Sequence, residues 1–421
     1  MSSRCASSGV ESVPRITELK IRKILDSRGN PTIEVEVRSD TGSGRASAPS
    51  GASTGRFEAV TFSPSGIDVD VRNFTSAVAP ALVGMDVSQQ EEVDRKLHEL
   101  DGTKDFSRIG GSVAIATSIA VAKAAADCEG LPFYRYLAGS RDVSIPMPLA
   151  NVLGGGAHAV GGTDIQEFLS LASGPSVLDA VTANARLHKL VKEKLVERLP
   201  GDAIGKGDEG AWVASIGNEM AVEILVDSCQ EVTKETRVRC SPSLDMAAST
   251  YYSGGGYHYR EGTLSREEQI EFVADLIDEY GFVYVEDPLF EDDFEGFARL
   301  TELCGKKCLI VGDDLFVTNK ERLGRGIDLG AGNAVIIKPN QIGTLTDTLE
   351  TLSMAKKARY EAIVSHRSGE TTDNAIAHIA IAFRTFALKA GAVGGERMAK
   401  LNELIRIEEE LKSKEHGHGR S

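Results

Sequence analysis

The last third of the chain alternates short apolar runs with segments of helical length, and this alternation is the strongest constraint on the fold. Strands that alternate with helices are typical of a parallel sheet covered by helices. One of the intervening segments opens with a capping-box pattern, Ser265 to Glu268, which predicts a helix start. The runs that predict strands in this region are FVYVEDP, CLIVGDD, NAVIIKP, EAIVSHR and ALKAG.

Three earlier runs complete a set of eight predicted strands: MPLANVLGG, DIQEFLSLAS and CSPSLDMAA. Only polar, glycine-rich sequence separates Asn151 from Gln166, so the first two strands follow each other without a helix. The predicted fold class is therefore α/β, with a modified eight-stranded (β/α) barrel of the ββαα(βα)6 type over residues 141–412. An open, doubly wound sheet is the alternative.

The first part of the chain predicts a smaller α+β domain over residues 15–140. The runs ITELKIRKIL, PTIEVEV and GRASAPS predict a three-stranded antiparallel meander. Residues 112–128 are apolar on every face, which indicates a buried helix. Ser88 and Glu91 form a second capping-box pattern and predict another helix start. The polar, aperiodic ends, residues 1–14 and 413–421, are predicted to be disordered.

The charge balance excludes some classes of partner. The chain has 62 acidic and 47 basic residues, a formal net charge of −15. Nucleic acids and anionic membranes attract clustered Lys and Arg, so both are unexpected partners. The most apolar stretch, 112–128, is interrupted by polar residues and is too short for a membrane span. Scattered cysteines and an N-terminus without a secretory signal pattern favour a cytoplasmic location.

Ionisable residues stand at the carboxyl ends of most predicted strands. In a barrel these ends converge on one mouth, where active sites lie. A carboxylate that only caps the next helix explains any single case equally well, but it does not explain a series. The residues in this series are Asp245, Glu286, Asp313, Lys338, His366 and Lys389.

The carboxylates of this series predict a metal site. Asp245, Glu286 and Asp313 offer only hard oxygen ligands, which suit Mg²⁺ better than zinc. Lys338 precedes Pro339, which restrains the lysine backbone to the extended region. A nearby divalent cation destabilises an ammonium, so Lys338 could act as a base. A structural Lys–carboxylate pair is equally compatible with these residues.

Further candidates lie in glycine-rich or strand-end segments. Glu167 in DIQEF and Glu209 in GKGDEGAW are candidate acids, and His158 in GGGAHAVGG has a similar loop context. Each of them alone could be an ordinary surface residue. The candidate phosphate-binding residues are Arg367, Ser368 and Lys389.

The segment SGASTG, residues 50–55, formally matches the G-x-S-x-G nucleophile elbow around Ser53. That motif requires a strand, a turn and a helix in a large parallel sheet, whereas the meander here is antiparallel. A serine hydrolase is therefore a weak alternative. A loop that closes over the barrel mouth accounts better for the small residues.

Taken together, these segments resemble the enolase (phosphopyruvate hydratase) family, in its archaeal-type branch. The resemblance spans nearly the whole chain in family order, which is more specific than any one motif. The matching runs are DSRGNPTIEVEV, PSGASTG, NVLGGGAHA, QEF, GDEG, SLDMAAS, VEDPLFEDD, GDDLFVTN, KPNQIGTLTDT, VSHRSGETTD and GGERMAKLNELIRIEEEL.

The resemblance implies a Mg²⁺-dependent lyase that interconverts 2-phospho-D-glycerate and phosphoenolpyruvate plus water. Asp245, Glu286 and Asp313 would hold the first Mg²⁺, and Ser53 would help with a second ion that arrives with the substrate. Lys338 would remove the C2 proton, and Mg²⁺ would stabilise the enolate. Glu209, supported by Glu167, would be the acid that expels the 3-hydroxyl. The implied substrate-binding residues are His158, Glu167, His366, Arg367, Ser368, Lys389 and Ser53.

The resemblance also implies a homo-oligomer, either a dimer or an octamer of dimers. Two departures from the family pattern are the run TFSPSGID, where the family has an R-D-G stretch, and Ala211, where a second glycine often follows G-D-E-G. They leave open a related dehydratase that acts on a phosphonate analogue. A non-catalytic, enolase-like binding protein is another alternative, although the polar residues at the predicted mouth are complete.

Overall fold

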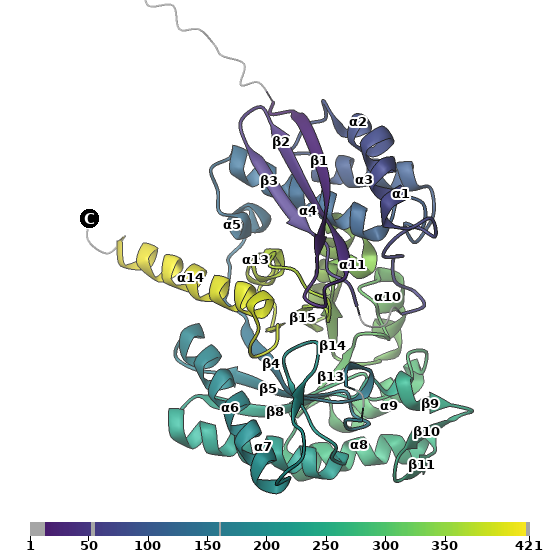
Figure 1. Ribbon diagram of the computed structural model, residues 1–421, viewed down its shortest axis with the longest axis vertical. Coiled ribbons are helices and arrows are strands. Elements are labelled where there is room, and N and C mark those ends of the chain that lie inside the picture. The colour runs from purple at the N-terminus through teal and green to yellow at the C-terminus, as the bar shows by residue number, and fades with distance from the viewer. Residues whose placement is uncertain (1–12, 52–54, 160, 418–421) are drawn as a thin grey trace, which may run out of the picture.

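The computed structural model describes residues 13–51, 55–159 and 161–417. Its N-terminal part contains a three-stranded antiparallel sheet. Its strands are β1 (Ile16–Leu25), β2 (Pro31–Ser39) and β3 (Ser43–Ser47). The sheet packs on helix α4 (Gly111–Cys128), so apolar alternation in the strands meets an alanine-rich helix (Figure 1). The approach is so close that a Cβ on Gly44 would lie 2.1 Å from the carbonyl oxygen of Ala120. The predicted meander and buried helix are confirmed.

Shorter helices complete this part of the molecule: α1 (Ile67–Asn73), the π-helix η1 (Phe74–Val78), α2 (Ala79–Leu82), α3 (Gln90–Asp101) and α5 (Phe133–Ala138). The predicted capping box at Ser88 is wrong, because α3 begins two residues later. The backbone N–H and the hydroxyl of Ser88 both donate to Oδ1 of Asp86. The Ser88 side chain therefore closes a turn before the helix and is not its cap.

Helix α4 alone, among the described residues, is long and apolar enough by composition to cross a membrane. In the structure 83% of it is buried. Its apolar character is accounted for by the protein core, because β2 and β3 cover one side and neighbouring helices cover others.

The second part is a closed barrel of eight strands. The strands are β4 (Met147–Gly154), β5 (Glu167–Ser173), β8 (Arg239–Asp245), β12 (Tyr284–Glu286), β13 (Leu309–Gly312), β14 (Ala334–Ile337), β15 (Glu361–Ser365) and β16 (Ala387–Lys389). They neighbour one another in chain order, and β16 pairs with β4 to close the ring. The predicted modified barrel is confirmed, and the open sheet is wrong.

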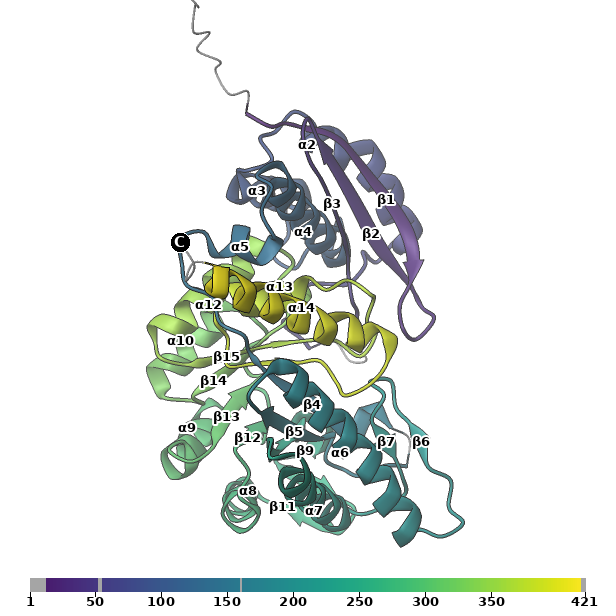
Figure 2. The same cartoon turned by 90° about the vertical axis from the view of Figure 1, so that its left-hand side faces the viewer.

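Helices surround the barrel (Figure 2). They are α6 (Val177–Arg198), α7 (Asn218–Thr236), α8 (Arg266–Tyr280), α9 (Phe294–Cys304), α10 (Lys320–Leu329), α11 (Pro339–Ile342), α12 (Leu345–Lys357), α13 (Ala375–Ala382) and α14 (Gly395–Gly417). The predicted capping box opens α8, where Ser265 and Glu268 satisfy each other's backbone N–H groups. The barrel interior is apolar and includes Leu149, Leu169, Tyr284, Val311 and Ile336.

Two small antiparallel units interrupt this pattern. One is a hairpin of β6 (Gly205–Lys206) and β7 (Trp212–Val213). The other is a three-stranded sheet of β9 (Tyr252–Ser253), β10 (Gly256–Tyr259) and β11 (Gly262–Leu264). The turn between β6 and β7 carries Glu209. The direction of β5 also matters for the site, because this strand runs antiparallel to both β4 and β8. Its first residue, Glu167, therefore lies opposite Asp245, the last residue of β8.

Candidate active site at the barrel mouth

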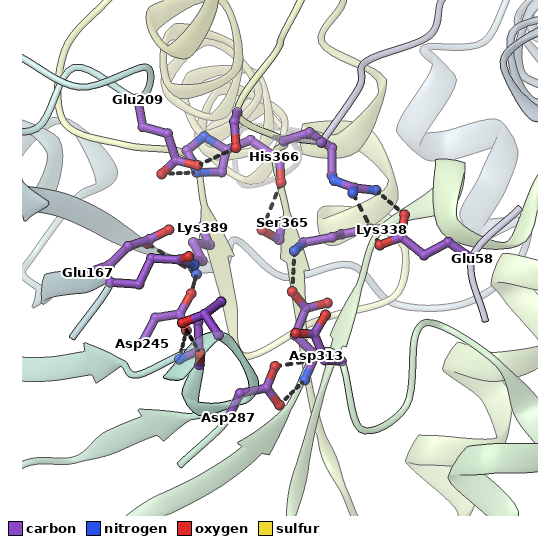
Figure 3. Close-up of a pocket in the computed structure, with 17 residues that line it drawn as sticks. Glu58, Glu167, Glu209, Asp245, Asp287, Asp313, Lys338, Ser365, His366 and Lys389 are labelled. Carbon is purple, nitrogen blue, oxygen red and sulfur yellow. Dashed lines mark hydrogen bonds and ion pairs between the residues drawn. The ribbon is translucent and has the colours of Figure 1, made fainter. Parts of the chain in front are cut away.

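A polar pocket lies at the carboxyl ends of the parallel strands (Figure 3). Gly51 and Glu58 of the N-terminal part also line it. Most of the side chains that line it are ionisable. They come from the strand ends, the β6–β7 turn and the segment after β3. The lining includes Glu58, Glu167, Glu209, Asp245, Asp287, Asp313, Asp314, Lys338, His366, Arg367, Ser368 and Lys389.

Lys389 lies at the centre of three carboxylates. Its Nζ is 2.8 Å from Oδ2 of Asp245, 2.9 Å from Oε2 of Glu286 and 3.2 Å from Oε2 of Glu167. Burial alone would lower the pKa of this ammonium, but the carboxylates outweigh burial and hold its pKa well above the usual value. The side chain is 3% exposed, so this cluster is shielded from water.

Glu286 is the most deeply buried of these acids, with a fully covered side chain. Burial, reinforced by the charge of Asp245, raises its pKa well above the usual value. Its Oε2 accepts hydrogen bonds from the Tyr284 hydroxyl and from Lys389. Within the described part of the chain, its Oε1 has no hydrogen-bond partner. An unsatisfied buried oxygen is costly, so this atom is suited to a cation as a ligand.

Lys338 follows β14 directly and contacts Asp313, which follows β13. Burial would lower the pKa of Lys338, but Asp313 outweighs that effect and the net pKa lies above the usual value. The pKa of Asp313 is correspondingly lowered, because Lys338 and other cations outweigh its burial. The second oxygen of Asp313 accepts a hydrogen bond of 3.0 Å from Gln341. The spacing of the strand ends thus places a lysine beside a carboxylate.

A second acidic group lies beside this pair. Asp287, Asp313 and Asp314 each offer a carboxylate oxygen within 4.8 Å of the others, an arrangement that could hold a metal ion. Asp287 also accepts the backbone N–H groups of Asp313 and Asp314, at 3.0 and 2.7 Å. Burial raises the pKa of Asp314 to about 7, with Asp313 contributing. Sequence reasoning missed Asp287 and Asp314, although the doublets in VEDP and GDDL were a visible signal.

Arg367 is buried and pairs with Glu58, which follows the SGASTG loop. Nη1 of Arg367 lies 3.0 Å from Oε2 of Glu58, and Nη2 lies 3.3 Å from Oε1. Asn340 also accepts from Nη1, at 3.2 Å. This ion pair joins the N-terminal sheet region to the barrel, so the N-terminal part completes the pocket. The charged strand ends in the sequence do not reveal this contact of Glu58, because Arg367 is distant from it in the chain.

His366 lies beside Glu209 on the other side of the pocket (Figure 3), and Ser368 also contacts Glu209. Nε2 of His366 lies 3.2 Å from Oε2 of Glu209, and the Ser368 hydroxyl lies 3.4 Å from Oε1. Burial lowers the pKa of His366 to about 4, although Glu209 acts in the opposite direction. The ring is therefore neutral at pH 7.

The structure thus brings together ten of the candidate residues at one mouth: Glu167, Glu209, Asp245, Glu286, Asp313, Lys338, His366, Arg367, Ser368 and Lys389. Ser53 lies outside the described residues, as does the side chain of His158. The described neighbours of Ser53 are Gly51, which lines the pocket, and Gly55, whose N–H donates to Glu58.

Comparison with known proteins agrees with this geometry. The family model described as "Enolase, C-terminal TIM barrel domain" matches residues 142–421, and "Enolase, N-terminal domain" matches residues 16–137. The chain is 52% identical over 402 residues to the enolase of Methanosphaera stadtmanae, covering 94% of this chain and 97% of that protein.

Two further archaeal relatives give the same result. The enolase of Natronomonas pharaonis is 53% identical over 397 residues, which cover 93% of this chain and 98% of that protein. The enolase of Picrophilus torridus is 46% identical over 396 residues, which cover 94% and 99%. On both the family models and these relatives, this chain belongs to the enolase family.

Proposed function

We propose that the barrel mouth interconverts 2-phospho-D-glycerate and phosphoenolpyruvate plus water, as a phosphopyruvate hydratase. Family membership over nearly the whole chain supports this lyase reaction. The observation that carries the assignment to these residues is the arrangement of a lysine base and a glutamic acid on opposite sides of one carboxylate-rich pocket.

The carboxylates suit Mg²⁺. Asp245, Glu286 and Asp313 would hold the first ion, since they are buried oxygen donors and Oε1 of Glu286 has no partner among the described residues. Asp287 and Asp314 lie beside Asp313 and widen the acidic surface. When bound, Mg²⁺ supplies positive charge where the substrate carboxylate becomes more negative. A second ion, arriving with the substrate and held in part by Ser53, completes the proposal.

Lys338 is the proposed base. It takes the C2 proton on Nζ, and the electron pair of the broken C–H bond moves toward the substrate carboxylate. The ammonium form of Lys338 is stabilised in this structure mainly by Asp313. When Asp313 instead binds a metal ion, it no longer stabilises the ammonium form of Lys338. The burial of Lys338 then favours the neutral amine, which is the form that accepts a proton.

Glu209 is the proposed acid. It gives a proton to the 3-hydroxyl, so that the C3–O bond breaks and water leaves as the C2–C3 double bond forms. Glu167, the first residue of β5, supports this step and also contacts Lys389. The proposed substrate-binding residues are His158, Glu167, His366, Arg367, Ser368, Lys389 and Ser53, with the cations facing phosphate and carboxylate oxygens.

The surroundings of the reaction are proposed with it. We expect a cytoplasmic homo-oligomer, a dimer or an octamer of dimers, that acts on a phosphorylated small molecule and on neither nucleic acid nor a membrane. The formal net charge of −15 supports the absence of a polyanionic partner. The domain limits proposed are residues 15–140 and 141–412.

The test is a turnover assay that follows the ultraviolet absorbance of the enol product. Substrate and Mg²⁺ should produce the signal, and EDTA should abolish it. A signal indifferent to EDTA, or no signal with the wild-type protein, contradicts the proposal. A parallel assay with the phosphonate analogue separates the related dehydratase, and labelling by a fluorophosphonate would instead support a serine hydrolase.

A further inference from the structure

Arg397, near the start of α14, is fully buried although its charge is permanent. Its Nη1 lies 2.9 Å from Nδ1 of His366 and 2.5 Å from the carbonyl oxygen of Arg367. Its Nη2 donates to the carbonyl oxygens of Asp208, at 3.2 Å, and Ser368, at 2.7 Å. One guanidinium therefore joins the turn that carries Glu209 to the segment that carries His366.

The backbone leaves room for this side chain. A Cβ on Gly391 would lie 3.3 Å from Cγ of Arg397, and a Cβ on Gly394 would lie at the same distance from that atom. Both glycines also have positive φ values, 72° and 116°, which other residues rarely adopt. The turn between β16 and α14 is thus shaped to admit the arginine stem.

The contact with His366 determines which ring nitrogen carries the proton. A guanidinium has only donors, so Nδ1 of His366 must accept the hydrogen bond from Arg397. A neutral imidazole carries a single proton, which is then on Nε2. Nε2–H then lies 3.2 Å from Oε2 of Glu209, so the tautomer places a hydrogen, and not a lone pair, beside that oxygen.

The tautomer in turn distinguishes the two oxygens of Glu209. Oε2 faces two donors, Nε2 of His366 at 3.2 Å and Nδ2 of Asn151 at 3.3 Å. An oxygen that lies beside two N–H groups is poorly placed to carry a proton of its own. Oε1 lies 3.4 Å from the Ser368 hydroxyl, a group that can either donate or accept.

We propose that Arg397 is a positioning residue: it fixes the Nε2–H tautomer of His366 and so makes Oε1 of Glu209 the atom that carries the acid proton. The consequence for turnover rests on the proposed function, whereas the tautomer is a property of the protein without substrate. The two parts can therefore fail independently.

Lys400 provides a matched control on the same helix. It is also buried, one turn after Arg397, and it supports the same segment after β15. Its Nζ donates to Oε2 of Glu370, at 2.7 Å, and to the carbonyl oxygen of Thr371, at 2.5 Å. Lys400→Met should loosen this segment, whereas Arg397→Met should in addition release Nδ1 of His366.

The experiment is ¹⁵N NMR of the imidazole of His366, assigned by comparison with His366→Gln, together with steady-state kinetics. We expect the Nε2–H tautomer in the wild type and in Lys400→Met, and a mixture in Arg397→Met. We expect kcat of Arg397→Met to fall about 10- to 100-fold, with KM within about threefold, because the acid proton is misplaced while substrate contacts remain.

An Nδ1–H tautomer in the wild type overturns the proposal without any variant, so the test holds even if Arg397→Met fails to fold. The proposal is also overturned if Arg397→Met keeps a pure Nε2–H tautomer. It is likewise overturned if Lys400→Met changes the tautomer and kcat as much as Arg397→Met does. A wild type with the Nε2–H tautomer but no turnover would contradict the proposed function and leave the positioning role of Arg397 supported.

Discussion

The two lysines at the barrel mouth differ in their surroundings although both stand at strand ends. Lys389 is held by three carboxylates, from Glu167, Asp245 and Glu286. Lys338 contacts one, from Asp313. Removing a proton from Lys389 would leave three buried acidic groups without their shared cation, whereas Lys338 would lose its proton beside a single acidic group, that of Asp313. This difference in the number of neighbouring acids supports the proposal that Lys389 is a fixed counter-charge and Lys338 the proton acceptor.

The largest expected effect is on turnover at Lys338. Lys338→Ala should lower kcat by about 10²- to 10⁴-fold, the usual contribution of a positioned base. Lys338→Arg keeps the positive charge beside Asp313 but cannot release its proton at neutral pH. Lys338→Arg should lose about as much activity as Lys338→Ala in the absorbance assay. It should keep a higher free energy of unfolding than Lys338→Ala, as measured by urea unfolding. An Arg variant with more than a tenth of wild-type kcat would remove Lys338 from the role of base.

Stability should respond more strongly at the other lysine. Lys389→Met leaves three buried carboxylates without their shared cation, and the free energy of unfolding should fall by about 3–5 kcal/mol in EDTA. Mg²⁺ should recover part of this loss, because a ligand that binds only the folded state stabilises it.

The matched control is Lys338→Met, which leaves a single carboxylate, Asp313, without its lysine. We expect a smaller loss of stability in this variant than in Lys389→Met, measured by urea unfolding under the same conditions. Equal losses in the two variants would show that the number of neighbouring acids does not set the difference between the lysines.

A third cation extends the comparison to the N-terminal part of the molecule. Arg367 pairs with Glu58, so Glu58→Gln should leave the guanidinium less firmly oriented. We expect KM to rise about tenfold, or ~1.4 kcal/mol, with a smaller change in kcat. Arg56→Gln is the control, since it lies on the same segment, is exposed and contacts Asp292 instead. Equal effects from the two variants would point to a general disturbance of the segment.

The sequence alone predicted the barrel, the meander and most of the strand-end residues, because hydrophobic periodicity decides which residues form strands and strand ends converge in a barrel. Local patterns were less reliable where a side chain had another partner. Ser88 matched a capping box, but Asp86 takes its hydrogen bonds.

The distant contacts on which a residue's role depends were not predictable. Glu58 acquires its partner 309 positions later in the chain. Asp287 holds backbone N–H groups of the next strand end, and Arg397 reaches His366 from the final helix. Nothing in the local sequence around these three residues specifies such partners, since they arise only when the barrel closes.

The smallest expected effect concerns an ion pair outside the mouth, where water weakens the interaction. Nε2 of His98 on α3 lies 2.8 Å from Oδ2 of Asp347 on α12, and the His98 side chain is 42% exposed. Hydrogen bonding to Asp347 raises the pKa of His98, against its partial burial. Hydrogen bonding to His98 and Thr344 lowers the pKa of Asp347, although burial acts in the opposite direction.

Because of these two pKa shifts, the pair stabilises the fold only within a range of pH. A raised histidine pKa contributes stability that is complete below the unfolded value of about 6.5 and is lost as the pH rises through the folded value. A lowered aspartate pKa contributes stability above about 3.9 that is lost as the pH falls through the folded value. His98→Gln should therefore cost about 0.2–1 kcal/mol of unfolding free energy near pH 5.5 and less at pH 9. His258, which contacts Thr263 and a backbone carbonyl instead of a carboxylate, is the control. A loss from His98→Gln that is the same at both pH values would assign the contribution of His98 to its ring contact with Phe106 and not to charge.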